Sequence, residues 1–178
     1  MTLVAALCFD TMLCGTTVVT ATDLWMAGQT NRIEVTLGSV LDSVDLAEEL
    51  STRIAGSAGF DEEIRDRIAM AVREGVINAL TYGSQGSPHK KIFLTLELNA
   101  DKLLIRVLDQ GPGFDLADVP DPLAEENLLK SSGRGIFLMR AFMDEFDVRR
   151  GAAGGAEVIM AKRLPSAAGG PLLAGSAS

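Results

Sequence analysis

Two polar side chains, Glu74 and Asn78, stand one turn apart on an expected helix. At 100° per residue they share one face, roughly opposite an apolar stripe that begins at Ile64. One interpretation is a solvated polar face. Met70 and Ile77 lie on the same side, however, which indicates a buried helix that is apolar nearly all round. An ionised Glu there requires a partner or an ion, and a carboxylate next to an amide oxygen suits a hard cation such as Mg²⁺.

A second pattern, Asp109-Gln-Gly-Pro-Gly113, follows an expected strand. Gly111 and Gly113 permit a positive φ or the close approach of a ligand to the backbone. Taken alone, the pattern is equally consistent with an ordinary turn. The hypothesis that Asp109 binds a ligand therefore needs support from the other motifs.

A third pattern, Gly133-Arg134-Gly135, precedes the apolar run 136–143. Free amides at a helix N-terminus can hold phosphate oxygens. A dinucleotide fingerprint does not fit, because a third Gly is missing and no parallel βαβ unit surrounds the pair. The Lys-Ser/Thr of a Walker loop is absent too.

In this order the three patterns resemble a known set. Glu74-x-x-x-Asn78-Ala is similar to the N box, and the second and third patterns are similar to the two glycine boxes, of the ATPase superfamily that includes gyrase-type, Hsp90-type and histidine-kinase catalytic domains. Gly113-Phe-Asp, Gly135-Ile-Phe-Leu-Met-Arg and the ending Gly-Gly-Ala-Glu-Val-Ile-Met-Ala-Lys-Arg-Leu resemble the anti-sigma-factor serine kinases. The resemblance covers residues 32–164.

The resemblance implies a role for each polar residue. Asp109 would accept a hydrogen bond from the adenine amino group of ATP. Asn78 would coordinate the Mg²⁺ that bridges the phosphates, and Glu74 would be the general base that accepts the proton of an attacking hydroxyl.

The resemblance also assigns the loop. Arg134 would assist catalysis beside Mg²⁺ and the backbone amides, because phosphoryl transfer depends mainly on positioning and charge neutralisation. Residues 112–132 would form the ATP lid. The remaining nucleotide-binding positions would be Gly111, Gly113, Gly133 and Gly135.

Two positions depart from the family pattern. Many relatives have a His shortly after the N-box Asn and a Thr in the last strand, where this chain has Tyr82 and Ala156. The Thr helps to hold adenine, so Ala156 puts nucleotide affinity in question but leaves the Asp109 contact. His89, the single histidine, follows a proline in a polar turn and is expected to be solvated.

Helices and strands are expected around these motifs. Ser39 and Asp61 are the expected caps of two helices, of which the second runs to about Tyr82, and a third helix begins after Gly135. The expected strands are 32–37, 92–98, 103–108, 145–150 and 157–163. This order predicts an α+β fold, a two-layer α/β sandwich whose mixed, mostly antiparallel sheet carries helices on one face.

Composition narrows the class of protein. With 178 residues, 47% of them apolar, the chain predicts one domain, which we place at 29–164. The net charge of −8 argues against binding to nucleic acid or anionic lipid. Cys8 and Cys14 form neither a disulfide framework nor a metal-binding spacing, which fits a cytoplasmic location.

The two ends are expected to lie outside the domain. Residues 1–28 have no basic start typical of a signal peptide and no uninterrupted apolar span. We interpret them as a disordered extension or an overlong gene model, with Met26 as a natural start. Residues 165–178, rich in Gly, Ala and Ser, are expected to be a disordered tail.

The leading hypothesis, taken from the resemblance, is a homodimeric anti-sigma factor that binds a sigma factor and uses ATP to phosphorylate a Ser or Thr on an antagonist protein. A nucleotide-dependent binding module without turnover is the second hypothesis. An orphan histidine-kinase catalytic domain is the third, although the dimerising helix with a phosphorylatable His is missing.

Overall fold

The computed structural model describes residues 3–5, 18–22, 31–113, 134–151 and 154–165. Its strands form one sheet in the order β1-β2-β3-β4-β5-β7-β6, and all neighbouring strands of the described sheet are antiparallel. The strands are β1 Leu3–Ala5, β2 Val18–Thr22, β3 Asn31–Gly38, β4 Lys91–Leu98, β5 Lys102–Leu108, β6 Glu145–Arg150 and β7 Ala156–Arg163.

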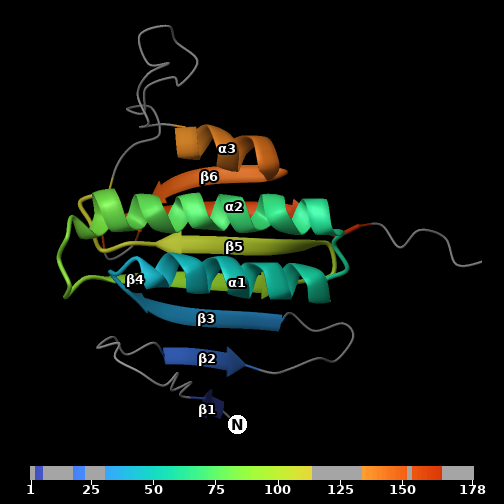
Figure 1. Ribbon diagram of the computed structural model, residues 1–178, viewed down its shortest axis with the longest axis horizontal. Helices are drawn as coiled ribbons and strands as arrows, with labels where there is room; N and C mark the ends of the chain where they lie inside the picture. Colours follow the sequence, from blue (N-terminus) through green and yellow to red (C-terminus); the bar gives the residue numbers. More distant parts are fainter. Residues whose placement is uncertain (1–2, 6–17, 23–30, 114–133, 152–153, 166–178) are drawn as a thin grey trace, which may run out of the picture.

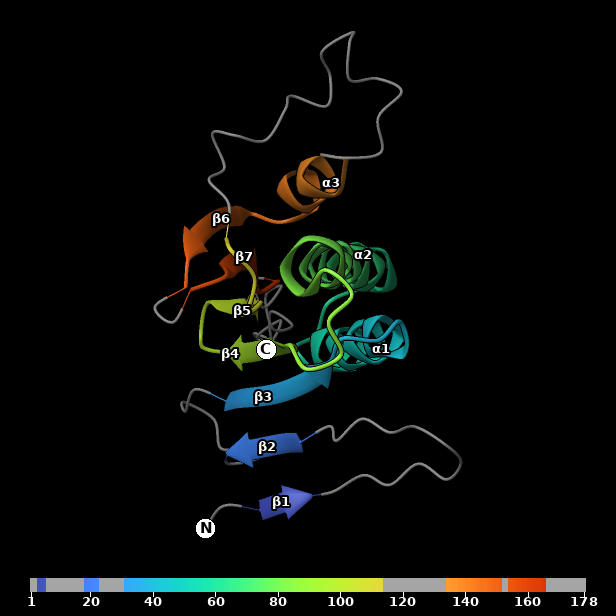
Figure 2. The same cartoon turned by 90° about the vertical axis from the view of Figure 1, so that its left-hand side faces the viewer.

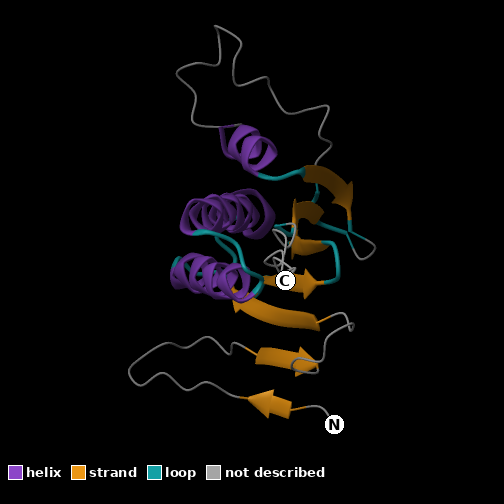
Figure 3. Ribbon diagram, turned by 90° about the vertical axis from the view of Figure 1, so that its right-hand side faces the viewer, coloured by secondary structure: helices purple, strands orange, loops and turns teal. Residues whose placement is uncertain are grey.

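One face of this sheet is apolar because side chains alternate along each strand. In β4 the side chains of Ile92, Leu94 and Leu96 are buried, and β5 repeats the alternation in register with it. Figure 3 shows that the three α-helices all cover the same face, and Figure 2 shows the two layers from the other side. The predicted two-layer α+β sandwich is confirmed, but the expectation of a mixed sheet is wrong, because every described strand pair is antiparallel.

The helices are α1 Asp42–Ser57, α2 Glu62–Asn78 and α3 Arg134–Phe142. In Figure 1, α2 lies between the other two. The predicted apolar stripe of α2 faces the core, since Ile68, Val72 and Val76 are fully buried. The expectation of a helix apolar all round is wrong at Met70, which is 46% exposed. At Met70, the side of α2 that faces away from the sheet is therefore exposed to solvent.

Only one of the two predicted caps is present. Asp61 caps α2, because its carboxylate accepts a hydrogen bond from the Ile64 amide at 2.9 Å. Ser39 does not cap α1, which begins at Asp42 after Leu41. The Ser39 hydroxyl donates instead to the Lys90 carbonyl, at 2.6 Å, just before β4. The Ser39 side chain therefore joins distant segments of the chain and does not cap a helix.

The second predicted helix changes character before its end. The α-helix ends at Asn78, and Ala79–Ser84 forms a π-helix, η1, which is followed by the left-handed residue Gln85. π-helical turns are rare and occur often at functional sites. The segment that links the first two sequence patterns is thus the least regular part of the helical layer.

Parts of the N-terminal extension belong to the sheet. β2 pairs with β3, with Val19 opposite Val35, and β1 pairs with β2. These two short strands lie inside the expected N-terminal extension, where their backbones continue the hydrogen-bond ladder beyond β3. The domain boundaries at 29 and 164 stay predictions, and residues 166–178 lie outside the described residues. Across the described parts of the chain, no helix is both long and apolar enough to cross a membrane.

Candidate functional site

Glu74, Asn78 and Gly135 meet where α3 begins beside α2. A Cβ atom added to Gly135 would lie 2.5 Å from Oε2 of Glu74 and 3.5 Å from Nδ2 of Asn78. Only a residue without a side chain fits this position without moving the carboxylate. Two patterns that are far apart in the sequence therefore form one cluster of polar groups.

The first turn of α3 adds positive character to this cluster. Arg134 is the first residue of α3 and is exposed, while Gly135 is buried against α2. The dipole of the helix favours an anion at this end. Gly133, the other glycine of the pattern, lies outside the described residues.

Asp109 is a buried carboxylate at the end of β5, with 7% of its surface exposed. Its Oδ1 accepts hydrogen bonds from the amides of Gly111, at 2.7 Å, and Ala156, at 3.1 Å. Both donors bind the same oxygen, so among the contacts of the described residues Oδ2 is the oxygen that can accept from a ligand. Fixed backbone donors hold this carboxylate in one orientation.

Three glycines crowd Asp109. A Cβ on Gly83 of η1 would collide with the Asp109 side chain, and a Cβ on Gly111 would lie 2.6 Å from the Gly83 Cα. A Cβ on Gly155 would collide with the Asp109 carbonyl oxygen. The sequence patterns did not identify Gly83 or Gly155, which read as a helix stop and part of a turn. A usable signal was the glycine pair directly before the last strand.

The predicted start of the lid is fixed to the sheet. Gly113 has the expected positive φ, 75°. At Gly111 the reason for a glycine is different, because neighbouring atoms leave no room for a Cβ. The guanidinium of Arg150, at the end of β6, donates to the Pro112 carbonyl at 2.8 Å. The rest of the predicted lid, residues 114–132, lies outside the described residues.

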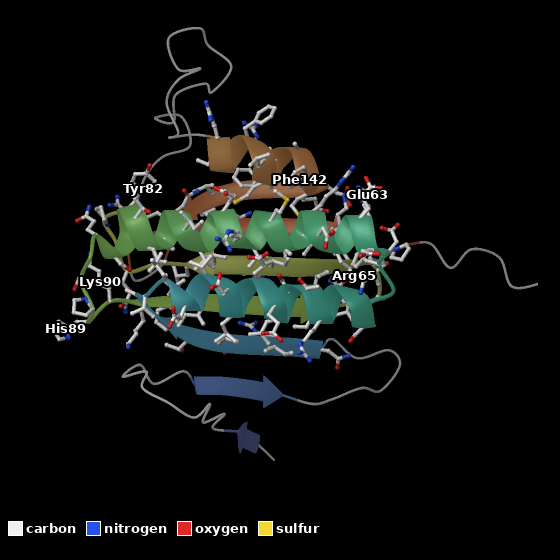
Figure 4. The ribbon with its side chains drawn as sticks, viewed as in Figure 1. Glu63, Arg65, Tyr82, His89, Lys90 and Phe142 are labelled. Carbon is white, nitrogen blue, oxygen red and sulfur yellow. The ribbon has the colours of Figure 1, made fainter. Side chains whose placement is uncertain are left out.

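Ala156 and Tyr82, the two departures from the family pattern, lie near Asp109 or at the same end of the molecule. Ala156 is buried and supports Asp109 through its backbone, a contact that needs no particular side chain. Tyr82 is 52% exposed on η1. His89 is exposed, as expected, and Figure 4 shows it at the same end of the molecule.

The donor set fits a magnesium ion held mainly by phosphates. The described residues contain no group of three His, Cys, Asp or Glu side chains that could hold a metal by themselves. Glu74 and Asn78 offer a carboxylate and an amide next to the space that a Gly135 side chain would fill. Mg²⁺ is usually held by one or two protein oxygens together with substrate phosphates.

Replacing Gly155 by alanine is expected to lower the free energy of unfolding by about 2–4 kcal/mol, because it adds backbone strain to a collision. Gly155 has a φ of 83°, and its Cβ would meet the Asp109 backbone. Gly154→Ala is the matched control, since Gly154 has a φ of 92° but no atom within 4 Å of its Cβ. Chemical denaturation measures both, and equal losses would contradict the packing argument.

Comparisons with known proteins show which family this chain resembles. Residues 39–162 match the family described as the histidine kinase-like ATPase domain. The serine-protein kinase RsbW of Listeria innocua is 28% identical over 145 residues, which cover 78% of this chain and 91% of that protein. The anti-sigma F factor of Oceanobacillus iheyensis is 31% identical over 99 residues, 54% of this chain and 68% of that protein. The anti-sigma F factor of Clostridium perfringens is 32% identical over 105 residues, 58% of this chain and 74% of that protein.

Proposed function

Because this chain belongs to the family of histidine kinase-like ATPase domains, we propose that it is an ATP-dependent serine kinase that acts as an anti-sigma factor. In this proposal it binds a sigma factor and transfers phosphate from ATP to a Ser or Thr of an antagonist protein. The relatives that carry the names serine-protein kinase and anti-sigma factor support both halves of the proposal.

One observation carries the proposal. The buried Gly135 brings the N-terminal end of α3 against Glu74 and Asn78 of α2. Phosphoryl transfer needs anion-binding amides and a proton acceptor close together. The proximity of Glu74 to the N-terminal end of α3 supports the proposal that both functions meet at this junction.

Glu74 is the proposed general base. The hydroxyl oxygen of the antagonist's Ser or Thr would form a bond to the γ-phosphorus as the bond to the ADP oxygen breaks, and the Glu74 carboxylate would take the hydroxyl proton. Glu74 and Gly135 are close enough for the carboxylate to stand beside phosphates held by the amides of α3. Arg134, at the same helix end, would contribute positive charge.

Asn78 is the proposed protein ligand for Mg²⁺. When bound, Mg²⁺ would neutralise the charge of the phosphates and orient them. Asn78 lies one turn beyond Glu74 on α2 and close to Gly135, so its amide oxygen can reach the same space. The assigned oxygen and nitrogen of an amide can be exchanged by a flip of the side chain.

Asp109 is the proposed adenine-reading residue. Its Oδ1 is held by two backbone amides, which leaves Oδ2 to accept a hydrogen bond from the adenine amino group. Gly111, Gly113, Gly133 and Gly135 complete the proposed nucleotide site. The proposal also includes a homodimer and a cytoplasmic location, where ATP and sigma factors meet.

The direct test of the function is transfer of labelled phosphate from ATP to a candidate antagonist, with nucleotide titration of the same protein. We expect transfer to Ser or Thr and magnesium-dependent ATP binding. If ATP binds tightly but no co-encoded antagonist is phosphorylated, the alternative of a binding module without turnover is correct. If neither ATP nor ADP binds at millimolar concentration, the proposed function is wrong.

Asn78→Ala is expected to weaken Mg-ATP binding by about tenfold to a hundredfold, because a metal ligand acts on binding as well as on chemistry. Titration with ATP in the presence of Mg²⁺ and in EDTA measures the effect. The loss should disappear in EDTA, where wild type and variant should bind ATP equally. An equal loss in both conditions would show that Asn78 does not act through the metal.

A further inference from the structure

The π-helix η1 is held by a group of hydrogen bonds that the proposed catalytic roles do not use. The Lys90 ammonium donates to the Gly83 carbonyl at 2.9 Å. The Ser39 hydroxyl donates to the Lys90 carbonyl at 2.6 Å and lies 2.6 Å from the hydroxyl of Ser84. These residues come from the β3–α1 turn, from η1 and from the turn before β4.

The donors and acceptors of this group are determined by counting hydrogens. Ser39 has one hydroxyl hydrogen, which it gives to the Lys90 carbonyl, so Ser84 must donate to the Ser39 oxygen. Ser84 is fully buried, and a buried hydroxyl without a partner would be costly. Lys90 therefore contacts η1 twice, directly through its ammonium and indirectly through Ser39.

The residue that this group fixes is the one packed on Asp109. The Gly83 backbone lies against the Asp109 side chain so closely that no Cβ fits between them. If Gly83 moved away from Asp109, the carboxylate would lose a contact that holds it in place. Figure 4 shows Lys90 at the end of the molecule where η1 and the turn before β4 lie.

We propose that Lys90 is a positioning residue for nucleobase recognition: its ammonium, by holding the Gly83 carbonyl, keeps Gly83 against Asp109 and so sets the orientation of the carboxylate that reads the base. This inference rests on the proposed function. In this inference, Lys90 affects how the base of the nucleotide is bound and does not affect how the phosphates are bound.

The test separates positioning from simple attraction of phosphate. The variants are Lys90→Met, which keeps much of the length but loses the ammonium, Lys90→Arg, which keeps a donor, and Lys91→Met, which removes the same charge one residue away. Titration calorimetry with ATP, GTP and adenosine measures each variant. Adenosine has no phosphates, so its affinity reports recognition of the base and ribose without any contribution from phosphate binding.

We expect Lys90→Met to weaken the binding of ATP and of adenosine by the same factor, about fivefold to twentyfold, because one charge-assisted hydrogen bond is lost. The ratio of ATP affinity to GTP affinity should fall in Lys90→Met. In Lys90→Arg this ratio should be close to the wild-type value. Lys91→Met should leave adenosine binding unchanged. If Lys90→Met weakens ATP but not adenosine, or changes neither, the positioning role is wrong.

A folding defect would not leave the proposal untested. Lys90→Gln is a second variant that removes the ammonium but keeps a polar side chain, and it should also narrow the preference for ATP over GTP in a protein with a cooperative melting transition. Unchanged selectivity in a folded Lys90→Gln protein would overturn the proposal. Failure of the wild type to bind either ATP or adenosine would instead count against the proposed function.

Discussion

Glu74→Ala is expected to lower the rate of phosphate transfer by about 10²–10⁴-fold while Mg-ATP still binds, because a general base acts on the transition state and need not touch the bound nucleotide. The structure places the Glu74 carboxylate against Gly135, at the end of α3 where phosphates would be held. Transfer of labelled phosphate to the antagonist, measured in single turnover, gives the chemical rate without product release.

Glu63→Ala is the matched control for this experiment. It removes a carboxylate from the same helix, but Glu63 is exposed in the first turn of α2, where it pairs with Arg67. Its transfer rate should equal that of the wild type. A Glu74→Ala protein that transfers phosphate at the wild-type rate would rule out the general-base role, while the kinase function would stand.

Asp109→Asn is expected to weaken ATP binding by about tenfold to a hundredfold, because an unmatched donor at a buried site is costly. The two backbone amides need an oxygen at the Oδ1 position, so the new amide would place its nitrogen where Oδ2 stands. That nitrogen would face the amino group of adenine, donor against donor. It could instead donate to the oxygen at the same position of a guanine base.

The measurement is competition between ATP and GTP for the wild type and the variant. The preference for ATP should fall, and the affinity for GTP should hold or rise. Asp101→Asn, in the exposed hairpin between β4 and β5, makes the same chemical change away from the site and should bind as the wild type does. Normal ATP preference in Asp109→Asn would refute the base-reading role without affecting the family assignment.

Local patterns predicted the elements well. The alternation in β3, β4 and β5 and the apolar stripe of α2 express periodicities of the backbone itself, which a short stretch of sequence already displays. The Asp61 cap needs only residues three apart. The Ser39 cap was a wrong prediction because α1 begins only at Asp42, and the Ser39 hydroxyl bonds to Ser84 and to the Lys90 carbonyl, both distant in the chain.

By itself, the sequence determined the order of the three motifs, the residues able to do chemistry and the succession of helices and strands. These depend on residue type and on spacing within single elements. Only the tertiary structure decided that Gly135 stands against Glu74 and that Gly83 and Gly155 press on Asp109. The reason is physical: a glycine at such a place is selected by the atoms that would meet its Cβ, and those atoms belong to other elements. A motif identifies the groups that react or bind. The orientation of those groups depends on the close approach of backbones from η1, from the end of β5 and from the start of β7.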